Sequence, residues 1–328
     1  MNRRGMLKLA LAGVSATAMR PRPGLTEGLF ARPIKLIVPF EPGGLLDVVA
    51  RLWAANARQS LGTIVVENVS GGGGTIGVAS VARAAPDGYT VLLGNSSTQI
   101  VTPLAMSRLP YDAAKDFAAV SILCVSTTCI AVSPSLPVKD LKGLIAYGKA
   151  NPGRLTYGSA GAGSMTNLAG EIFKHLTGLS DIVHAPYKGM APALSDVLGG
   201  QIPMITPNVT GQLLAYHHDG RIRILSVNAP KRLTAVPDLP TSAEAGLPGM
   251  ELQVFNGLFV RSGTAAPMIS KYSAAAEQVK QNLDFRDGLD KSGFEDAPAG
   301  NAAEAQRTVD REMVRLSRLV KDINFRAG

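Results

Sequence analysis

The chain has 328 residues, more than one typical core contains, so we expect two domains. With 46% hydrophobic and 18% charged residues, it has the composition of an ordinary globular protein. The formal net charge is +8, part of it within the first 32 residues, and no basic stripe interleaved with aromatic residues follows. We therefore expect no nucleic-acid partner, whereas the mild positive charge would attract an acidic solute.

The first 30 residues have the pattern of an export signal. Arg3-Arg4 form a basic region, residues 6–14 form a short apolar region, and Ala16-Thr17-Ala18 offers a cleavage site. The apolar run is too short to span a bilayer. The paired arginines suit either a Sec or a twin-arginine signal, and a frayed cytosolic terminus is the third alternative. We exclude residues 1–30 from the fold and expect a periplasmic protein.

From residue 34 to residue 98, apolar runs typical of strands alternate with segments of helical periodicity. Strands are expected at 34–38, 63–67 and 90–94. Helices are expected from Leu45 onward and at 76–84. A glycine loop covers 70–74, and a small polar loop, 95–98, follows the third strand.

A β-rich stretch at 120–132 contains both cysteines, Cys124 and Cys129. Their odd spacing places them on opposite faces of a continuous strand, so a disulfide would require a turn at 126–128. The alternative is two buried, small, apolar side chains. No C-x-x-C spacing is present, and we expect no metal site.

A second alternating series follows. The sequence predicts strands at 156–158, 182–185, 203–206, 222–227 and 251–260, and helices at 138–150, 167–177, 192–198, 212–218, 267–283, 284–291 and 302–324. Such alternation implies largely parallel sheets with helices on both faces. The expected division is lobe 1 at 31–126 and 257–328, and lobe 2 at 127–256. The last helix carries an apolar stripe that should dock on a lobe.

Two glycine-containing loops stand out, at 39–47 and 157–164, because each follows a strand and opens a helix. The N-terminus of a helix carries unpaired N–H groups and a partial positive charge, which suits an anion. In α/β sheets, ligands bind beyond the carboxyl ends of the strands. The two loops therefore predict a clamp for a small anionic ligand between two lobes.

Each residue of these loops also has a structural alternative. Gly43 and Gly44 could form only a tight turn, and Asp47 could only offset the helix dipole. Ser159 and Ser164 could be turn formers, and Thr166 could be the N-cap of its helix.

Catalytic motifs are poorly represented. There is no Gly-x-Ser-x-Gly elbow and no His-x-x-x-His pair, and glycines 71–74 are not followed by the Lys-Ser/Thr of a phosphate loop. We expect neither an enzyme nor a cofactor. A hydrolase that uses Ser159 or Ser164 is the alternative, disfavoured because the sequence shows no base near either serine.

A series of short motifs runs through the whole mature chain in a specific order. They are Val38-Pro39-Phe40 with Pro42-Gly43-Gly44 and Asp47, Val65-Val66-Glu67-Asn68, Ala84-Ala85-Pro86-Asp87-Gly88-Tyr89, Leu109-Pro110-Tyr111-Asp112, Lys115-Asp116-Phe117, Asn167-Leu168-Ala169-Gly170-Glu171, Pro186-Tyr187-Lys188-Gly189, Gly199-Gly200-Gln201, Pro237-Asp238-Leu239-Pro240-Thr241 and Glu244-Ala245-Gly246. With these motifs the chain resembles the Bug-type periplasmic receptors of tripartite tricarboxylate transporters.

The resemblance implies an α/β, type II periplasmic-binding-protein fold: two lobes with mixed, mostly parallel sheets and a hinged cleft that closes like a Venus flytrap. It implies a receptor that binds a small organic carboxylate and delivers it to the membrane permease of such a transporter. We expect a monomer. A sensor for a membrane signalling partner, such as a sensor kinase, is the alternative.

The resemblance also implies the ligand-binding positions. They are Phe40, Gly43, Gly44, Leu45, Leu46, Asp47, Asn95, Ser96, Ser97, Ser159, Gly161, Gly163, Ser164, Thr166, Asn167, Tyr187 and Asn208. Relatives usually have small or polar residues where this chain has Leu45-Leu46, and often histidine at the positions of Gln99 and Asn167. Pro207 stands where an acidic residue is frequent. These departures suggest a ligand with an apolar or aromatic body, unless Leu45 simply faces the core.

Overall fold

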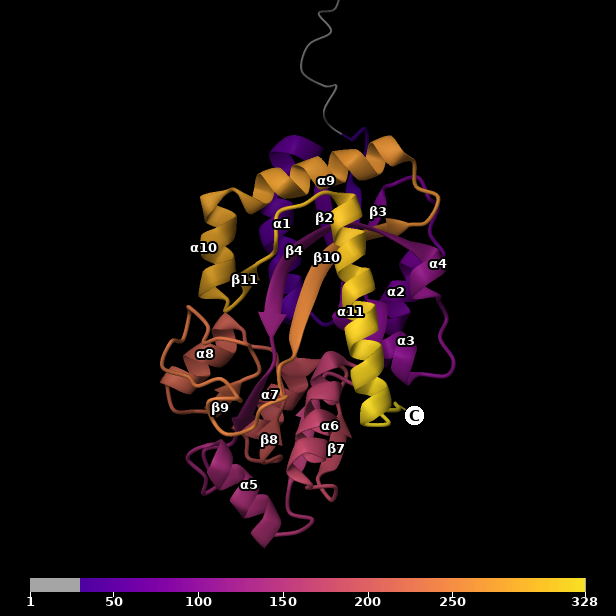
Figure 1. Cartoon of the computed structure of the whole chain (residues 1–328). Helices are drawn as coiled ribbons and strands as arrows, with labels where there is room; N and C mark the ends of the chain where they lie inside the picture. Colours follow the sequence, from indigo (N-terminus) through magenta and orange to yellow (C-terminus); the bar gives the residue numbers. More distant parts are fainter. Residues whose placement is uncertain (1–29, 328) are drawn as a thin grey trace, which may run out of the picture.

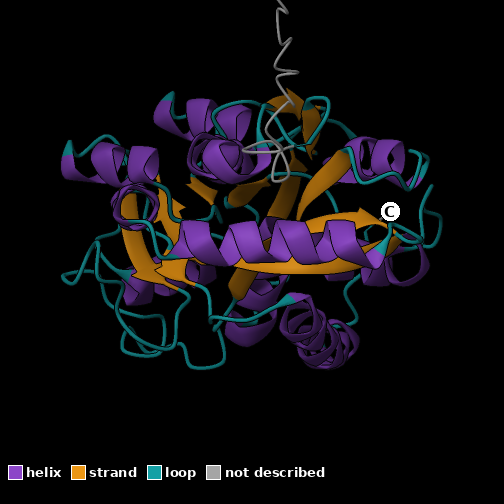
Figure 2. Ribbon diagram, turned by 90° about the horizontal axis from the view of Figure 1, so that it is seen from above, coloured by secondary structure: helices purple, strands orange, loops and turns teal. Residues whose placement is uncertain are grey.

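The structure is a computed structural model that describes residues 30–327. The predicted export signal therefore lies, except for Phe30, outside the described residues. Two sheets form the centres of two lobes, one above the other in Figure 1. Figure 2 shows helices on both sides of the strands, as the alternating pattern predicts.

The larger sheet belongs to lobe 1 and has the strand order β11-β4-β10-β3-β1-β2. Its strands are β1 (Ile34–Val38), β2 (Ile64–Asn68), β3 (Thr90–Asn95), β4 (Phe117–Thr127), β10 (Gln253–Arg261) and β11 (Glu295–Asp296). Strand β1 pairs in parallel with β2 and β3, whereas β10 is antiparallel to both β3 and β4.

Alternation along the strands of this sheet supplies two separate cores. The helices of lobe 1 are α1 (Leu45–Leu61), α2 (Thr75–Ala82), α3 (Thr102–Ala105), α4 (Ala113–Asp116), α9 (Ala266–Lys280), α10 (Leu283–Lys291) and α11 (Ala302–Asp322). On one face, Leu36 packs in a cluster with Trp53 of α1 and Tyr272 of α9. On the other face, Ile37 joins a cluster that includes Val78 of α2 and Leu316 of α11. Each face is thus covered by helices with a matching apolar side.

The smaller sheet belongs to lobe 2 and has the order β7-β6-β8-β5-β9. Its strands are β5 (Cys129–Val132), β6 (Thr156–Ser159), β7 (Val183–Pro186), β8 (Met204–Ile205) and β9 (Arg223–Val227), and its helices are α5 (Leu141–Ala150), α6 (Met165–Thr177), α7 (Met190–Leu198) and α8 (Gly211–His218).

Mixed sheets are confirmed, but the expectation that they are mostly parallel is wrong. Only β1–β2, β1–β3, β6–β7 and β6–β8 are parallel, and β10 and β5 pair antiparallel with both of their neighbours. The reason is that β4, β5 and β10 carry the chain between the lobes. A strand that leaves a lobe and a strand that returns to it run in opposite directions.

The crossing between the lobes consists of long strands and buried polar side chains. In Figure 1 the long strands β4 and β10 run from the upper lobe toward the lower one, and only Thr128 separates the end of β4 from the start of β5. Asn228 donates from Nδ2 to Oγ1 of Thr128 (2.8 Å), and Asn256 donates to Oγ of Ser126 (3.2 Å). These bonds satisfy polar groups that would otherwise be costly to bury at this crossing.

The cysteines are buried, free thiols, as the alternative to a disulfide predicts. Cys124 lies in the core of lobe 1 with Trp53, whereas Cys129 lies in the core of lobe 2 with Val227. Burial raises the pKa of both thiols.

Residues 95–98 do not form the polar loop that the sequence predicts. Strand β3 continues to Asn95, and Ser97–Val101 form a buried π-helical turn. The side chains of Asn95 and Thr98 make this possible, because each accepts a hydrogen bond from the other's backbone N–H, at 3.0 and 3.1 Å. Another boundary also moves: α5 begins at Leu141 rather than residue 138, because Asp140 is its N-cap and accepts from the N–H of Gly143 (2.7 Å).

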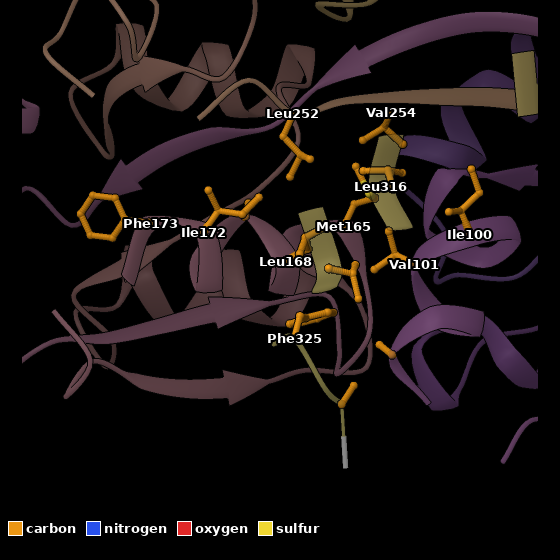
Figure 3. Close-up of a cluster of buried hydrophobic side chains, with 14 of the residues drawn as sticks. Ile100, Val101, Met165, Leu168, Ile172, Phe173, Leu252, Val254, Leu316 and Phe325 are labelled. Atoms are coloured by element: carbon orange, nitrogen blue, oxygen red, sulfur yellow. The ribbon is translucent and has the colours of Figure 1, made fainter. Parts of the chain in front are cut away.

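The apolar stripe of the last helix docks on lobe 1, as predicted. Leu316 and Val320 of α11 are buried. Figure 3 shows that the cluster around Leu316 continues into lobe 2 through Met165 and Leu168 of α6. One apolar cluster therefore spans both lobes. Among residues 30–327, no helix is both long and apolar enough to cross a membrane.

Candidate functional site

A small cavity lies between the two lobes, where three helices begin. The centre of a water-sized sphere can occupy about 60 Å³ of it, room for roughly four to six waters. Lobe 1 contributes Phe40, Glu41, Gly44, Leu45, Leu46, Asn95 and Ser97, and lobe 2 contributes Ala160, Ser164, Thr166, Gly189, Met190, Ala191 and Asn208. The cavity thus borders the N-termini of α1, α6 and α7.

Two of these three helix ends carry no side-chain cap. The N-cap residues of α1 and α7 are Gly44 and Gly189, and neither helix end receives a hydrogen bond from a capping side chain. The first N–H groups of a helix must find partners outside the helix. At α1 and α7 those partners can be a ligand or water, and the helix dipole favours a negative charge there.

The third helix end presents hydroxyl groups to the cavity. Ser164, not Thr166, is the N-cap of α6, so the alternative role for Thr166 is wrong: Oγ of Ser164 accepts from the N–H of Asn167 (3.1 Å). Oγ1 of Thr166 instead accepts from the N–H of Ala160 (2.9 Å) and lies 2.9 Å from Oγ of Ser164. Oγ of Ser164 donates to the carbonyl oxygen of Gly161 (2.7 Å), so the proton between the two hydroxyl groups comes from Thr166. These bonds hold the loop after β6 against the start of α6, and both residues line the cavity.

Among the described residues 30–327, no basic side chain lines the cavity. Glu41 is its one charged lining residue, and Oε1 of Glu41 accepts a hydrogen bond from Ser70 (2.5 Å). Lys188, a candidate partner for an acidic ligand, is exposed and does not line the cavity. An anion here would be held by backbone N–H groups, hydroxyl groups and helix dipoles.

Asp47 serves the loop rather than the cavity wall. Its Oδ2 accepts from the N–H of Gly43 and from Nε of Arg51, both at 2.9 Å. Burial opposes ionisation, but the hydrogen bonds from Arg51 and Gly43 outweigh it, and the pKa of Asp47 lies below its ordinary value. The carboxylate thereby fixes the turn that precedes α1.

Ser159 lies beside a histidine, so the prediction that neither serine has a base nearby is wrong. Oγ of Ser159 is 2.7 Å from Nε2 of His184, whose Nδ1 is 3.3 Å from Nδ2 of Asn167. Oδ1 of Asn167 accepts from the N–H of Gly163 (3.0 Å), which assigns Nδ2 as the donor toward His184. A histidine that accepts at Nδ1 carries its proton on Nε2 and donates to Ser159.

The geometry of this network indicates a structural role rather than a catalytic one. Ser159 is fully buried and does not line the cavity, and His184 points a proton at the serine instead of accepting one. A general base must accept the proton of the nucleophile. The trio therefore braces the second glycine loop.

Of the positions implied by the resemblance, the structure brings just over half to the cavity. Phe40, Gly44, Leu45, Leu46, Asn95, Ser97, Ser164, Thr166 and Asn208 line it. Gly43 lines an adjoining cavity. Leu46 is buried in the core of lobe 1 and Leu45 is half-buried, so the more core-facing of the two is Leu46.

The remaining positions support the loops from behind. Ser96 accepts from the N–H of Phe255 at the crossing (3.0 Å), and Tyr187 donates to Asp196 (2.6 Å). Gly161 and Gly163 adopt positive φ, +126° and +76°, within the second loop.

Sequence reasoning missed five lining residues: Glu41, Ala160, Gly189, Met190 and Ala191. The last three belong to a third strand–glycine–helix element, β7–Gly189–α7, which has the same local pattern as the two loops that were singled out. That pattern was the available signal.

The two lobes are in contact around the cavity. The N–H of Met165 donates to Oγ of Ser97 (2.9 Å), and Oγ1 of Thr102 donates to the carbonyl oxygen of Gly163 (3.0 Å). In the glycine loop at 70–74 of lobe 1, a Cβ added at Gly73 would lie 3.0 Å from the carbonyl oxygen of Ala162 in lobe 2. Glycine at position 73 thus permits the close approach of the lobes.

Comparison with known proteins identifies the family. The profile of the tripartite tricarboxylate transporter family receptor matches residues 49–325. The chain belongs to this receptor family. It is 36% identical to the protein BugT of Bordetella pertussis over 80% of each chain.

Solved structures of similar proteins share the fold of this receptor. The structure of R. palustris Rpa4515 with adipate has a TM-score of 0.86 and 31% identity, and covers 90% of this chain and 98% of its own. MatC from Rhodopseudomonas palustris with bound malate has a TM-score of 0.82 and 30% identity, and covers 89% and 100%. These comparisons confirm the resemblance to Bug-type receptors and the two-lobed periplasmic-binding-protein fold.

The His184 network should make the stability of the receptor sensitive to acid. Burial lowers the pKa of His184 from its ordinary 6.5, although Glu171 opposes the shift and Lys174 assists it. Because the unfolded chain takes up the proton more readily, the free energy of unfolding should fall as the pH drops from about 7 to about 5. His184→Gln should flatten this decline in urea titrations, whereas the exposed His218→Gln should not. Equal pH profiles for the two variants would contradict this expectation.

Proposed function

We propose that this receptor captures a small organic carboxylate in the cavity between its lobes and delivers it to the membrane permease of a tripartite tricarboxylate transporter. The convergence of three helix N-termini, two of them uncapped, on a cavity with the hydroxyl groups of Ser164 and Thr166 carries the proposal. Two similar structures contain adipate and malate, which are carboxylates.

The carboxylate head would lie between Leu45 and Thr166. Its oxygens would accept from the first N–H groups of α1 and from the hydroxyl group of Thr166, whose proton would turn from Ser164 to the ligand. These donors come from different lobes, so a bound carboxylate would favour the closed arrangement.

Lobe closure would follow a hinge at the crossing strands. We place the boundaries at residues 31–126 and 257–328 for lobe 1 and 127–256 for lobe 2. Backbone rotation at Thr128 and at the start of β10 would open the cleft.

We place the protein in the periplasm as a monomer, exported through a Sec or twin-arginine signal. Members of the family are periplasmic binding proteins. A sensor kinase as the membrane partner is the alternative. Crosslinking of ligand-loaded receptor in membranes, followed by identification of the captured protein as permease or kinase, separates the two.

The carboxylate site is tested by ligand-dependent unfolding. Receptor refolded from denaturant, and so stripped of ligand, is titrated with mono-, di- and aromatic carboxylates, phosphate and sugars. A carboxylate at a hundredfold excess over Kd should stabilise the fold by about 2.7 kcal/mol. Stabilisation by phosphate or sugars alone would overturn the proposal.

A pair of matched variants locates the site. Thr166→Val removes a cavity hydroxyl with little change of shape and should weaken carboxylate binding by at least tenfold, which is the scale of one lost bond to a charged group. Thr177→Val is the control, because this threonine lies at the other end of α6 and donates to the carbonyl oxygen of Phe173.

A further inference from the structure

A second cavity adjoins the first on the side of α7 and α8. The centre of a water-sized sphere can occupy about 40 Å³ of it, room for roughly three to four waters. The two cavities share Gly44, Leu45, Met190, Ala191 and Asn208 on their walls. We call this second cavity the side chamber.

The walls of the side chamber are mostly apolar and carry no charged residue. Leu45, Met190, Leu194, Pro207 and Leu213 supply most of them. The polar side chains on the wall are Asn208, Thr210 and Gln212. Oγ1 of Thr210 accepts from the N–H of Leu213 as the N-cap of α8 (3.2 Å), and Nε2 of Gln212 donates to the hydroxyl group of Tyr216 (3.4 Å), so they do not form a converging set of donors. A buried carboxylate without a cation or a set of free donors is costly, whereas a hydrocarbon gains by leaving water.

Asn208 stands at the junction of the two cavities. Its Oδ1 is buried and has no hydrogen-bond partner among the described residues. In this orientation the oxygen is an acceptor, so it repels a carboxylate oxygen and is satisfied by a hydroxyl group or a water molecule. This repulsion further disfavours a second carboxylate group in the side chamber.

We propose that the ligand of this receptor is a monocarboxylate with a short, uncharged, apolar tail, and that the tail occupies the side chamber. This inference rests on the proposed function, since the carboxylate head is the one placed between α1 and α6. The two cavities together hold roughly seven to ten water-sized groups, which fits the three heavy atoms of a carboxylate group with a tail of roughly four to seven carbons.

The inference gives Leu45 a role in specificity. Leu45 lines both cavities, so its side chain makes the entrance to the side chamber apolar. Its side chain is half-buried, as is that of Met190 on the opposite wall, so both can adjust around a tail.

The first test compares ligands of equal backbone length on stripped receptor by calorimetry. 4-Methylpentanoate should bind at least tenfold more tightly than glutarate, and 4-methylpentanamide, which lacks the charge, should not bind measurably. Each carbon added to the tail from propanoate upward should improve Kd by about fourfold until the chamber is full. Tighter binding of glutarate, or a flat series, would overturn the inference.

The second test changes the wall that the two cavities share, and propanoate reports any effect on the carboxylate head. Ala191→Leu adds bulk at the shared wall and should weaken 4-methylpentanoate about tenfold, while propanoate changes less than twofold. Met190→Ala should shift the optimum to a longer tail. Ala215→Leu on α8, an exposed alanine that lines neither cavity, is the control.

The outcomes distinguish the two proposals. If no carboxylate of any class binds, the proposed function fails and the inference fails with it. If carboxylates bind but neither tail length nor the Ala191 and Met190 variants alter the preference, only the inference about the side chamber fails.

Discussion

Replacing Gly170 with alanine will lower the free energy of unfolding of this receptor by about 3 kcal/mol, the scale of overpacking in a well-packed core. A Cβ at this position of α6 would lie 2.2 Å from the ring of Tyr157. That ring is fully buried and tied at its hydroxyl group, which donates to Glu171 (2.7 Å) and accepts from Asn167 (2.7 Å). The ring cannot move aside without breaking these bonds.

The direction of the change in the free energy of unfolding distinguishes overpacking from an ordinary gain in helix propensity. In an unconstrained helix interior, glycine to alanine stabilises by up to about 1 kcal/mol. Gly143→Ala in α5 is the matched control, because its nearest neighbour would be 3.3 Å away, and its effect should be near zero. Urea unfolding with equal m-values measures both. Equal stability of the two variants would show that the Tyr157 pocket yields easily.

Replacing Gly73 with alanine will weaken carboxylate binding by at least tenfold, in addition to lowering the free energy of unfolding by about 1–2 kcal/mol. The added Cβ would lie 3.0 Å from the backbone oxygen of Ala162 in the opposite lobe, so the closed arrangement is strained. An open arrangement would separate the two loops and remove this contact. A penalty confined to the closed state appears in Kd, because binding energy must then overcome it.

Backbone strain at position 73 needs its own control. Gly73 has a φ of +65°, where alanine costs about 1–2 kcal/mol in any protein. Gly153 has a φ of +73° in lobe 2, with nothing within 4 Å of an added Cβ. Gly153→Ala should therefore show the same small loss of stability in urea and an unchanged Kd by calorimetry. Weakened binding in both variants would remove lobe contact as the explanation.

Local sequence patterns predict most of the strands and helices correctly. The strand at Ile34–Val38 and the helix that starts at Leu45 follow from apolar runs and periodicity among neighbouring residues. The two glycine loops were placed at the cavity because a strand, a glycine turn and a helix start are a local arrangement, and parallel strands bring such ends to one edge. The apolar stripe of α11 was recognised for the same reason.

Errors arose where one side chain decided the outcome. Residues 95–98 were predicted as a loop, but the reciprocal bonds between Asn95 and Thr98 turn them into the start of a helical segment. The sequence offers Thr166 as a possible N-cap of α6, but the N-cap in the structure is Ser164. Small polar residues suit caps and turns alike, so composition cannot separate these roles.

The sequence by itself determined the family, the alternating strands and helices, and two of the three helix ends that carry the proposed site, because each depends on residues close together in the chain. Only the tertiary structure decided that the helix end at Gly189 reaches the same cavity as the other two, that His184 faces Ser159, and that an uncharged chamber opens beside Leu45. These features join residues from separate strands and both lobes. Their distances depend on how the sheets pack, which no local pattern contains.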